Sequence, residues 1–97
     1  MITKGPAIGA LIHKHCVVCG TANDHGLHVQ FTQLDDGRVQ GVFDCDRAFE
    51  GYPGKIHGGI ISALLDGAMT NCIFTQGDAG VTGELKVRYR LPVVVDR

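Results

Sequence analysis

The longest regular hydrophobic pattern of the chain lies between Gly58 and Thr75. At about 100° per residue, its apolar side chains fall on nearly every side of a helix, which is typical of an enclosed rather than a surface helix. These apolar residues are Ile60, Ile61, Ala63, Leu64, Leu65, Ala68, Met69, Cys72, Ile73 and Phe74. The run is shorter than the roughly 18 apolar residues of a bilayer crossing. The pattern therefore predicts one long buried helix over about residues 58 to 75.

Three other stretches alternate apolar and polar residues with the period of two expected for half-buried strands: 27–32, 38–45 and 81–91. The sequence Asp35-Asp36-Gly37 joins the first two and is typical of a hairpin turn. The third is the clearest, because it places Leu85, Val87, Tyr89 and Leu91 on one face. We expect that face to lie on the helix. Residues 49–56 are rich in glycine and proline and are interpreted as a loop leading to the helix.

Composition and charge narrow the class of protein. The 97 residues are 44% hydrophobic and 20% charged, with nine basic and ten acidic side chains, which indicates one ordered globular domain. No cluster of Lys and Arg is present, so nucleic acid and membrane surfaces are poor candidates for partners. The first ten residues lack a secretory apolar core. The four cysteines are therefore interpreted as reduced thiols of a cytoplasmic protein.

A Cys-x-x-Cys pair at Cys16 and Cys19 is the first candidate for chemistry. Four histidines lie near it in the sequence: His13, His15, His25 and His28. A closed zinc site normally needs a second spaced pair of ligands, and the chain has no second Cys-x-x-Cys. A tight turn packed by small residues is favoured over a structural zinc site and over a redox dithiol, so we predict no metal.

Asp66 is the one carboxylate within the apolar helix. It shares a strip with Ser62, Met69, Thr70 and Ile73, and an ionised carboxylate is costly to bury there. The alternative to a structural partner is a role in chemistry or at an interface, which we favour. At the helix start, Gly58 and Gly59 carry no side chain. A ligand oxygen can therefore approach free N–H groups at the positive end of the helix dipole.

Four segments of the sequence together resemble a known family. They are Gly51-Tyr52-Pro53-Gly54-Lys55-Ile56-His57-Gly58-Gly59, Leu64-Leu65-Asp66-Gly67-Ala68-Met69, Gly80-Val81-Thr82 and Tyr89-Arg90-Leu91-Pro92. Over residues 16–95 the chain resembles hotdog-fold acyl-CoA thioesterases of the phenylacetate-pathway type. The resemblance implies an α+β fold, in which an antiparallel β-sheet wraps around one long central helix. It also implies a hotdog domain over residues 16–97, after a lead-in over 1–15, that lacks the two C-terminal strands of its relatives.

The resemblance also implies roles for individual residues. The backbone N–H of Gly58 would polarise the thioester carbonyl, and Asp66 would be a general base or a nucleophile. Thr82 stands where relatives carry a Ser or Thr that helps to hold the water. His57 would fix the loop before the helix, and Gly59 would permit close packing beside the substrate. Some relatives have Asn or Gln at the position of Gly51.

Substrate-binding residues follow from the same resemblance. Met69, with Ile73 and Phe74, would suit an aromatic or medium aliphatic acyl group, although the same residues suit core packing. Arg88, Arg90 and Arg97 would meet the phosphates of coenzyme A, or would simply be solvated. Coenzyme A would be part of the substrate, and no separate cofactor is implied.

The spacing of Gly58 and Asp66 gives an independent argument for an oligomer. Eight residues of helix separate them by roughly 12 Å, at about 1.5 Å per residue. A base must lie within about 3 Å of the proton it takes, so one carbonyl carbon cannot use both groups of one chain. The spacing predicts a homodimer or a dimer of dimers, with Gly58 from one chain and Asp66 and Thr82 from another.

Three functions are therefore left open. The favoured one is an acyl-CoA thioesterase. The second is a non-catalytic or truncated hotdog protein that serves as a binding or assembly module. The third is a hotdog hydratase or dehydratase, which is disfavoured because those relatives use a catalytic histidine placed differently near the helix.

Overall fold

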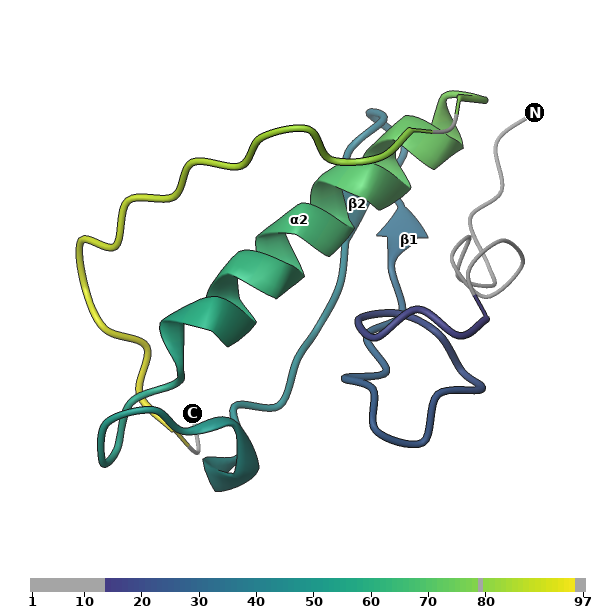
Figure 1. The fold of residues 1–97 in the computed structure, drawn as a ribbon. Helices are drawn as coiled ribbons and strands as arrows, with labels where there is room; N and C mark the ends of the chain where they lie inside the picture. Colours follow the sequence, from purple (N-terminus) through teal and green to yellow (C-terminus); the bar gives the residue numbers. More distant parts are fainter. Residues whose placement is uncertain (1–13, 79, 96–97) are drawn as a thin grey trace.

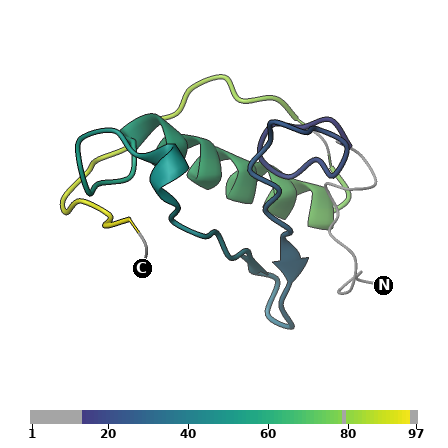
Figure 2. The same ribbon diagram turned by 90° about the horizontal axis from the view of Figure 1, so that it is seen from below.

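The long helix lies between a short β-hairpin on one side and an extended segment of the chain on the other (Figure 1). The computed structural model describes residues 14–78 and 80–95. Its elements are β1 (Thr32–Gln33), β2 (Val39–Gln40), the 3-10 helix η1 (Arg47–Phe49) and α2 (Gly58–Thr75). In two perpendicular views, the β1–β2 hairpin lies on one side of α2 and the extended segment that follows α2 lies on the other (Figures 1 and 2). The arrangement is α+β, as predicted. The predicted lead-in over residues 1–15 lies almost wholly outside the described residues.

Helix α2 has the bounds that the hydrophobic pattern predicts. It begins at Gly58 after an extended His57 (φ −60°, ψ 133°) and ends at Thr75. The next residue, Gln76, donates its N–H to the carbonyls of Ile73 and Phe74, which satisfies acceptors of the last turn. Gly77 follows at φ +87°, a conformation that favours glycine and turns the chain back along the helix.

One side of α2 packs against the core. Val18, Cys19, Val29 and Phe31 are buried there, and the partly buried residues Cys16, Leu27, Phe43, Ala63, Leu64 and Ala68 pack against them. Glycine is required at position 67, because a Cβ there would lie 2.7 Å from Cγ1 of Val18. The N-terminal turn (residues 14–22) can therefore lie directly on the middle of the helix.

The predicted enclosure of α2 on all sides is wrong for the single chain. Leu65, Met69 and Ile73 form a stripe with exposed fractions of 46%, 50% and 43%. They follow one another at four-residue spacing, so they share one helix face. The hairpin and the N-terminal turn cover only the opposite side of the helix, and this stripe is left in contact with solvent.

The first two predicted strands are present with a shorter ladder than expected. Strands β1 and β2 pair antiparallel, with Thr32 opposite Gln40 and Gln33 opposite Val39. The predicted alternation over 27–32 is confirmed by burial, since Val29 and Phe31 are buried while Gln30 between them is exposed. The backbone of this stretch bonds elsewhere: the N–H of Val29 donates to the carbonyl of Val18 at 2.9 Å. The N-terminal turn therefore takes the place of part of the partner strand.

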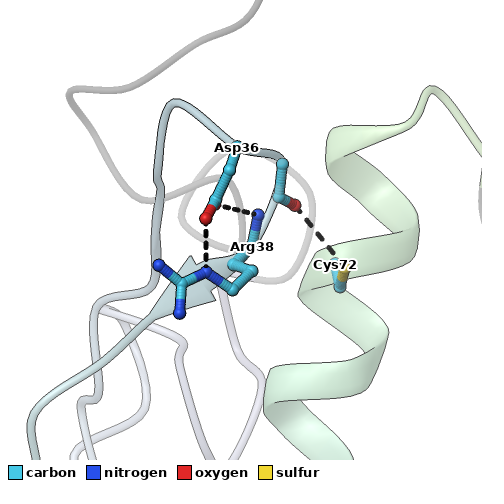
Figure 3. Close-up of polar contacts among 4 residues, drawn as sticks. Asp36, Arg38 and Cys72 are labelled. Atoms are coloured by element: carbon cyan, nitrogen blue, oxygen red, sulfur yellow. Dashed lines mark hydrogen bonds and ion pairs between the residues drawn. The ribbon is translucent and has the colours of Figure 1, made fainter.

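The hairpin turn packs its backbone against α2 (Figure 3). Asp36 accepts from the backbone N–H of Arg38 at 3.1 Å and pairs with its Nε at 2.7 Å. Gly37 adopts φ +90°, and its carbonyl oxygen lies 4.0 Å from Sγ of Cys72 on the helix. The predicted turn at residues 35–37 is thus confirmed, and it fixes the hairpin to the last turns of α2.

The predicted strand over 81–91 has no ladder partner in the described chain. It runs back along α2 as an extended segment, and its apolar side chains are largely exposed, with Tyr89 at 52% and Leu91 at 82%. It contacts the helix through Thr82, which hydrogen-bonds to Asp66, and through Tyr89, which hydrogen-bonds to Gly58. The segment is fixed beyond Pro92, where Val93 accepts from the N–H of Ile56 at 2.8 Å and Val95 donates to Gly54 at 3.1 Å.

Candidate active site

His57 caps the start of α2. Its Nδ1 accepts the backbone N–H of Gly59 at 2.8 Å, as the side-chain acceptor of a helix N-cap does. Its own backbone N–H donates to the carbonyl of Phe49 at 2.8 Å, which ties the helix start to η1. A Cβ at Gly59 would lie 3.0 Å from the imidazole. Gly59 therefore permits the close approach of the capping ring, and its N–H is already occupied.

Gly58 supplies the N–H that remains available at the helix start. As the first helical residue it has no intrahelical acceptor, and within residues 14–78 and 80–95 no other acceptor takes its N–H. It lines a cavity of about 390 Å³ together with Gly51, Tyr52, Lys55, Ile56 and His57. The positive end of the helix dipole and the nearby Lys55 ammonium favour a ligand oxygen with negative charge here.

The loop before α2 is held by its own backbone. Glu50 accepts the N–H of Gly54 at 2.9 Å, and Gly51 donates to the carbonyl of Lys55 at 2.9 Å. A Cβ at Gly51 would lie 3.2 Å from Cα of His57, so this position is tight. Glycine at this position therefore allows close contact between the loop and the capping residue.

Tyr89 contacts the helix start, although sequence reasoning assigned it no role in the site. Its hydroxyl donates to the carbonyl of Gly58 at 2.8 Å and also contacts Oγ of Ser62. It therefore fastens the extended segment to the first turn of α2. The available signal was the alternation over 81–91, which places Tyr89 on the face toward the helix without indicating this hydrogen bond.

Asp66 and Thr82 form the second half of the site. Oγ1 of Thr82 donates to Oδ1 of Asp66 at 2.5 Å, and it is the only donor to this carboxylate among the described residues. The pair lies at a cavity of about 160 Å³, which Met69, Thr70 and Ile73 also line with residues of the segment that follows the helix. A half-buried carboxylate with one ordered donor retains acceptor positions for a water molecule.

The structure gathers the predicted residues into two separate places. His57, Gly58 and Gly59 lie at the helix start, while Asp66, Thr82 and Met69 lie eight or more residues further along. The two cavities share no lining residue. Arg88 and Arg90 are exposed on the segment between them and line neither cavity, and Arg97 lies outside the described residues.

Neither a metal cluster nor a membrane-spanning helix is present in the described part of the chain. Within residues 14–78 and 80–95, no group of three or more His, Cys, Asp or Glu side chains is placed to hold a metal ion. His13, one of the histidines near the cysteine pair, lies outside these residues. In the same part of the chain, no helix has the length and apolarity needed to cross a membrane.

Comparison with known proteins places this architecture in a class. No family model matches the chain. The crystal structure of a thioesterase superfamily protein superposes with a TM-score of 0.79 at 32% sequence identity. The match covers 86% of this chain and 41% of that protein, so the chain spans less than half the length of this relative. The predicted resemblance to the hotdog-fold thioesterase superfamily is confirmed.

The capping role of His57 predicts a specific change in stability. Replacing His57 with Ala removes the acceptor for the Gly59 N–H and is expected to lower the free energy of unfolding by about 1 kcal/mol. His57→Asn restores a side-chain acceptor at the cap and is expected to recover most of the loss. Urea denaturation of the three proteins measures the difference; equal losses in both variants would contradict the capping role.

Proposed function

We propose that the protein hydrolyses acyl-CoA thioesters at a site shared by two copies of the chain. The observation that carries the proposal is the Thr82–Asp66 hydrogen bond of 2.5 Å, which orients a half-buried carboxylate at a cavity beside the helix. The unoccupied N–H of Gly58 supplies the complementary group. Since these groups lie about 12 Å apart on one helix, each site uses Gly58 of one copy and the Asp66–Thr82 pair of another.

The chemistry needs one base and one donor to the carbonyl oxygen. Asp66 takes a proton from water as the water oxygen attacks the thioester carbon. The charge that develops on the carbonyl oxygen is stabilised by the Gly58 N–H and the helix dipole. Collapse of the tetrahedral intermediate expels the coenzyme A thiolate, which takes up the proton held by Asp66. Direct attack by the Asp66 carboxylate, through an acyl-enzyme anhydride, is the alternative path.

The surroundings of the two half-sites suit the two ends of an acyl-CoA. Met69 and Ile73 offer an apolar lining beside Asp66, which suits an aromatic or medium aliphatic acyl group. Lys55 lines the cavity at the helix start, and Arg88 and Arg90 are exposed on the extended segment. These cations are available to the phosphates of coenzyme A.

Removing the base is expected to abolish turnover. Asp66→Asn keeps an oxygen acceptor for Thr82 but cannot take a proton, so kcat falls by about 10²-fold or more. Release of coenzyme A thiol from a panel of aromatic and aliphatic acyl-CoA substrates measures the effect. No hydrolysis by the unmodified protein would favour a binding or assembly module.

A single turnover in heavy-oxygen water distinguishes general-base catalysis from direct attack by Asp66, because only the anhydride path places label in the Asp66 side chain.

The N–H of Gly58 can be removed with little change in backbone shape. Proline is favoured at the first helical position, and His57 already has the extended conformation that precedes proline. Gly58→Pro is expected to lower kcat by about 10²- to 10³-fold, as loss of an oxyanion donor does. Gly58→Ala retains the N–H, and its Cβ would make ordinary contact with the Tyr89 ring at 3.5 Å. Equal activity of the Pro and Ala variants would exclude this N–H from the reaction.

A further inference from the structure

The Cys-x-x-Cys pair forms a built turn that the proposed hydrolysis does not use. The N–H of Gly20 donates to the carbonyl of Cys16 at 2.9 Å, which closes one turn of backbone around both cysteines. A Cβ at Gly20 would lie 2.4 Å from the backbone nitrogen of Cys16 and 2.5 Å from the carbonyl oxygen of Lys14. Because backbone atoms cannot move aside, glycine at this position holds the turn tight. The two thiols lie close enough to interact, since the Cys19 side chain forms a hydrogen bond with Cys16.

The two thiols differ in their access to solvent. Cys19 is 1% exposed and belongs to the core, while Cys16 is partly exposed at the edge of the same cluster. A small molecule in solution can therefore reach Cys16, whereas Cys19 is shielded from it and lies beside Cys16 in the same turn. This is the arrangement of an attacking thiol and a buried resolving thiol.

A buried amide on α2 is aimed at the inner cysteine. The side chain of Asn71 is also 1% exposed; its Nδ2 lies 3.8 Å from Sγ of Cys19 and donates to the carbonyl of Gly67 at 2.8 Å. Its Oδ1 is buried with no hydrogen-bond partner, which is costly in a core of this size. An apolar residue would avoid that cost if Cys19 served only as packing. The amide N–H is instead placed to stabilise negative charge on the Cys19 sulfur.

The electrostatic surroundings of the two thiols also favour Cys16 as the attacking thiol. Partial burial opposes ionisation of Cys16, but the backbone N–H groups of Cys19, Val18 and Gly20, together with the Cys19 thiol, outweigh it and lower the pKa of Cys16. Burial raises the pKa of Cys19 to about 11. At neutral pH the outer sulfur is therefore the more readily ionised of the two, and the thiolate is the reactive form.

We propose that Cys16 and Cys19 are a redox-active dithiol that exchanges with low-molecular-weight disulfides and closes into an internal disulfide. The Cys16 thiolate attacks one sulfur of the small disulfide, which forms a mixed disulfide and releases one small thiolate. Cys19 gives its proton to solvent, attacks the Cys16 sulfur and releases the second small thiol. The two cysteines lose two electrons, and the small disulfide gains them.

The experiment uses oxidised and reduced glutathione as the probe. In a background with Cys45→Ser and Cys72→Ser, the protein is equilibrated over a range of glutathione ratios, quenched in acid and alkylated. We expect both remaining thiols to become unreactive together, with a mass lower by two hydrogen atoms and with full recovery after reduction. A mixed disulfide that persists as the final product, or thiols that stay free at every ratio, would overturn the proposal.

Single variants separate the roles of the two sulfurs. Cys19→Ser is expected to accumulate one glutathione on Cys16, because no resolving thiol remains. Cys16→Ser is expected to lose modification altogether, because Cys19 is buried. Cys19→Ala serves as a second variant if the serine impairs folding. Equal glutathione labelling of Cys16→Ser and Cys19→Ser would contradict the assignment, as would a zinc ion bound in stoichiometric amount that blocks both thiols in the purified background variant.

Discussion

The fixed rise of an α-helix is the constraint on which the rest of this structure depends. Helix α2 begins at Gly58, whose N–H is available because no earlier turn of the helix supplies a carbonyl acceptor. Asp66 lies two turns further along, on the same rigid element. No change of side-chain conformation brings the two groups to one carbonyl carbon. A reaction that needs both must therefore take them from two copies of the helix.

The packing around the helix agrees with a site that is shared by two copies of the chain. The N-terminal turn and the hairpin cover one side of α2, where Gly67 allows Val18 to lie against the backbone. The opposite side carries the exposed stripe of Leu65, Met69 and Ile73. The extended segment that crosses this region touches the helix through Tyr89 at one end and Thr82 at the other. Asp66 and Thr82 thus lie beside a helix face that the single chain leaves exposed to solvent.

The amino-acid pattern was most informative where it records burial. The helix over 58–75, the turn at 35–37 and the buried face of 27–32 follow from hydrophobic periodicity and turn chemistry, and all three are present. Alternation over 81–91 predicted an extended strand but no partner for it, because a period of two describes side-chain direction and does not identify a neighbouring strand. The segment is extended and has no ladder partner among the described residues.

The candidate site was predictable to a similar extent. Asp66 and Gly58 could be selected from burial cost and helix-end chemistry. The family resemblance selected Thr82 as a residue that helps to hold the water, but it did not predict the hydrogen bond from Thr82 to Asp66. The hydrogen bond from Tyr89 to Gly58 depends on tertiary placement, which no local pattern contains. The same holds for Asn71 beside Cys19, since the two residues are 52 positions apart in the sequence.

Complementation between two inactive variants tests the shared site most directly. Gly58→Pro and Asp66→Asn chains are co-expressed with different affinity tags, and the mixed dimer is purified. One of its two sites then combines an intact Gly58 with an intact Asp66, so the account predicts about half of the wild-type thioesterase activity per dimer. A mixed dimer no more active than either parent would show that the two groups do not act together across copies.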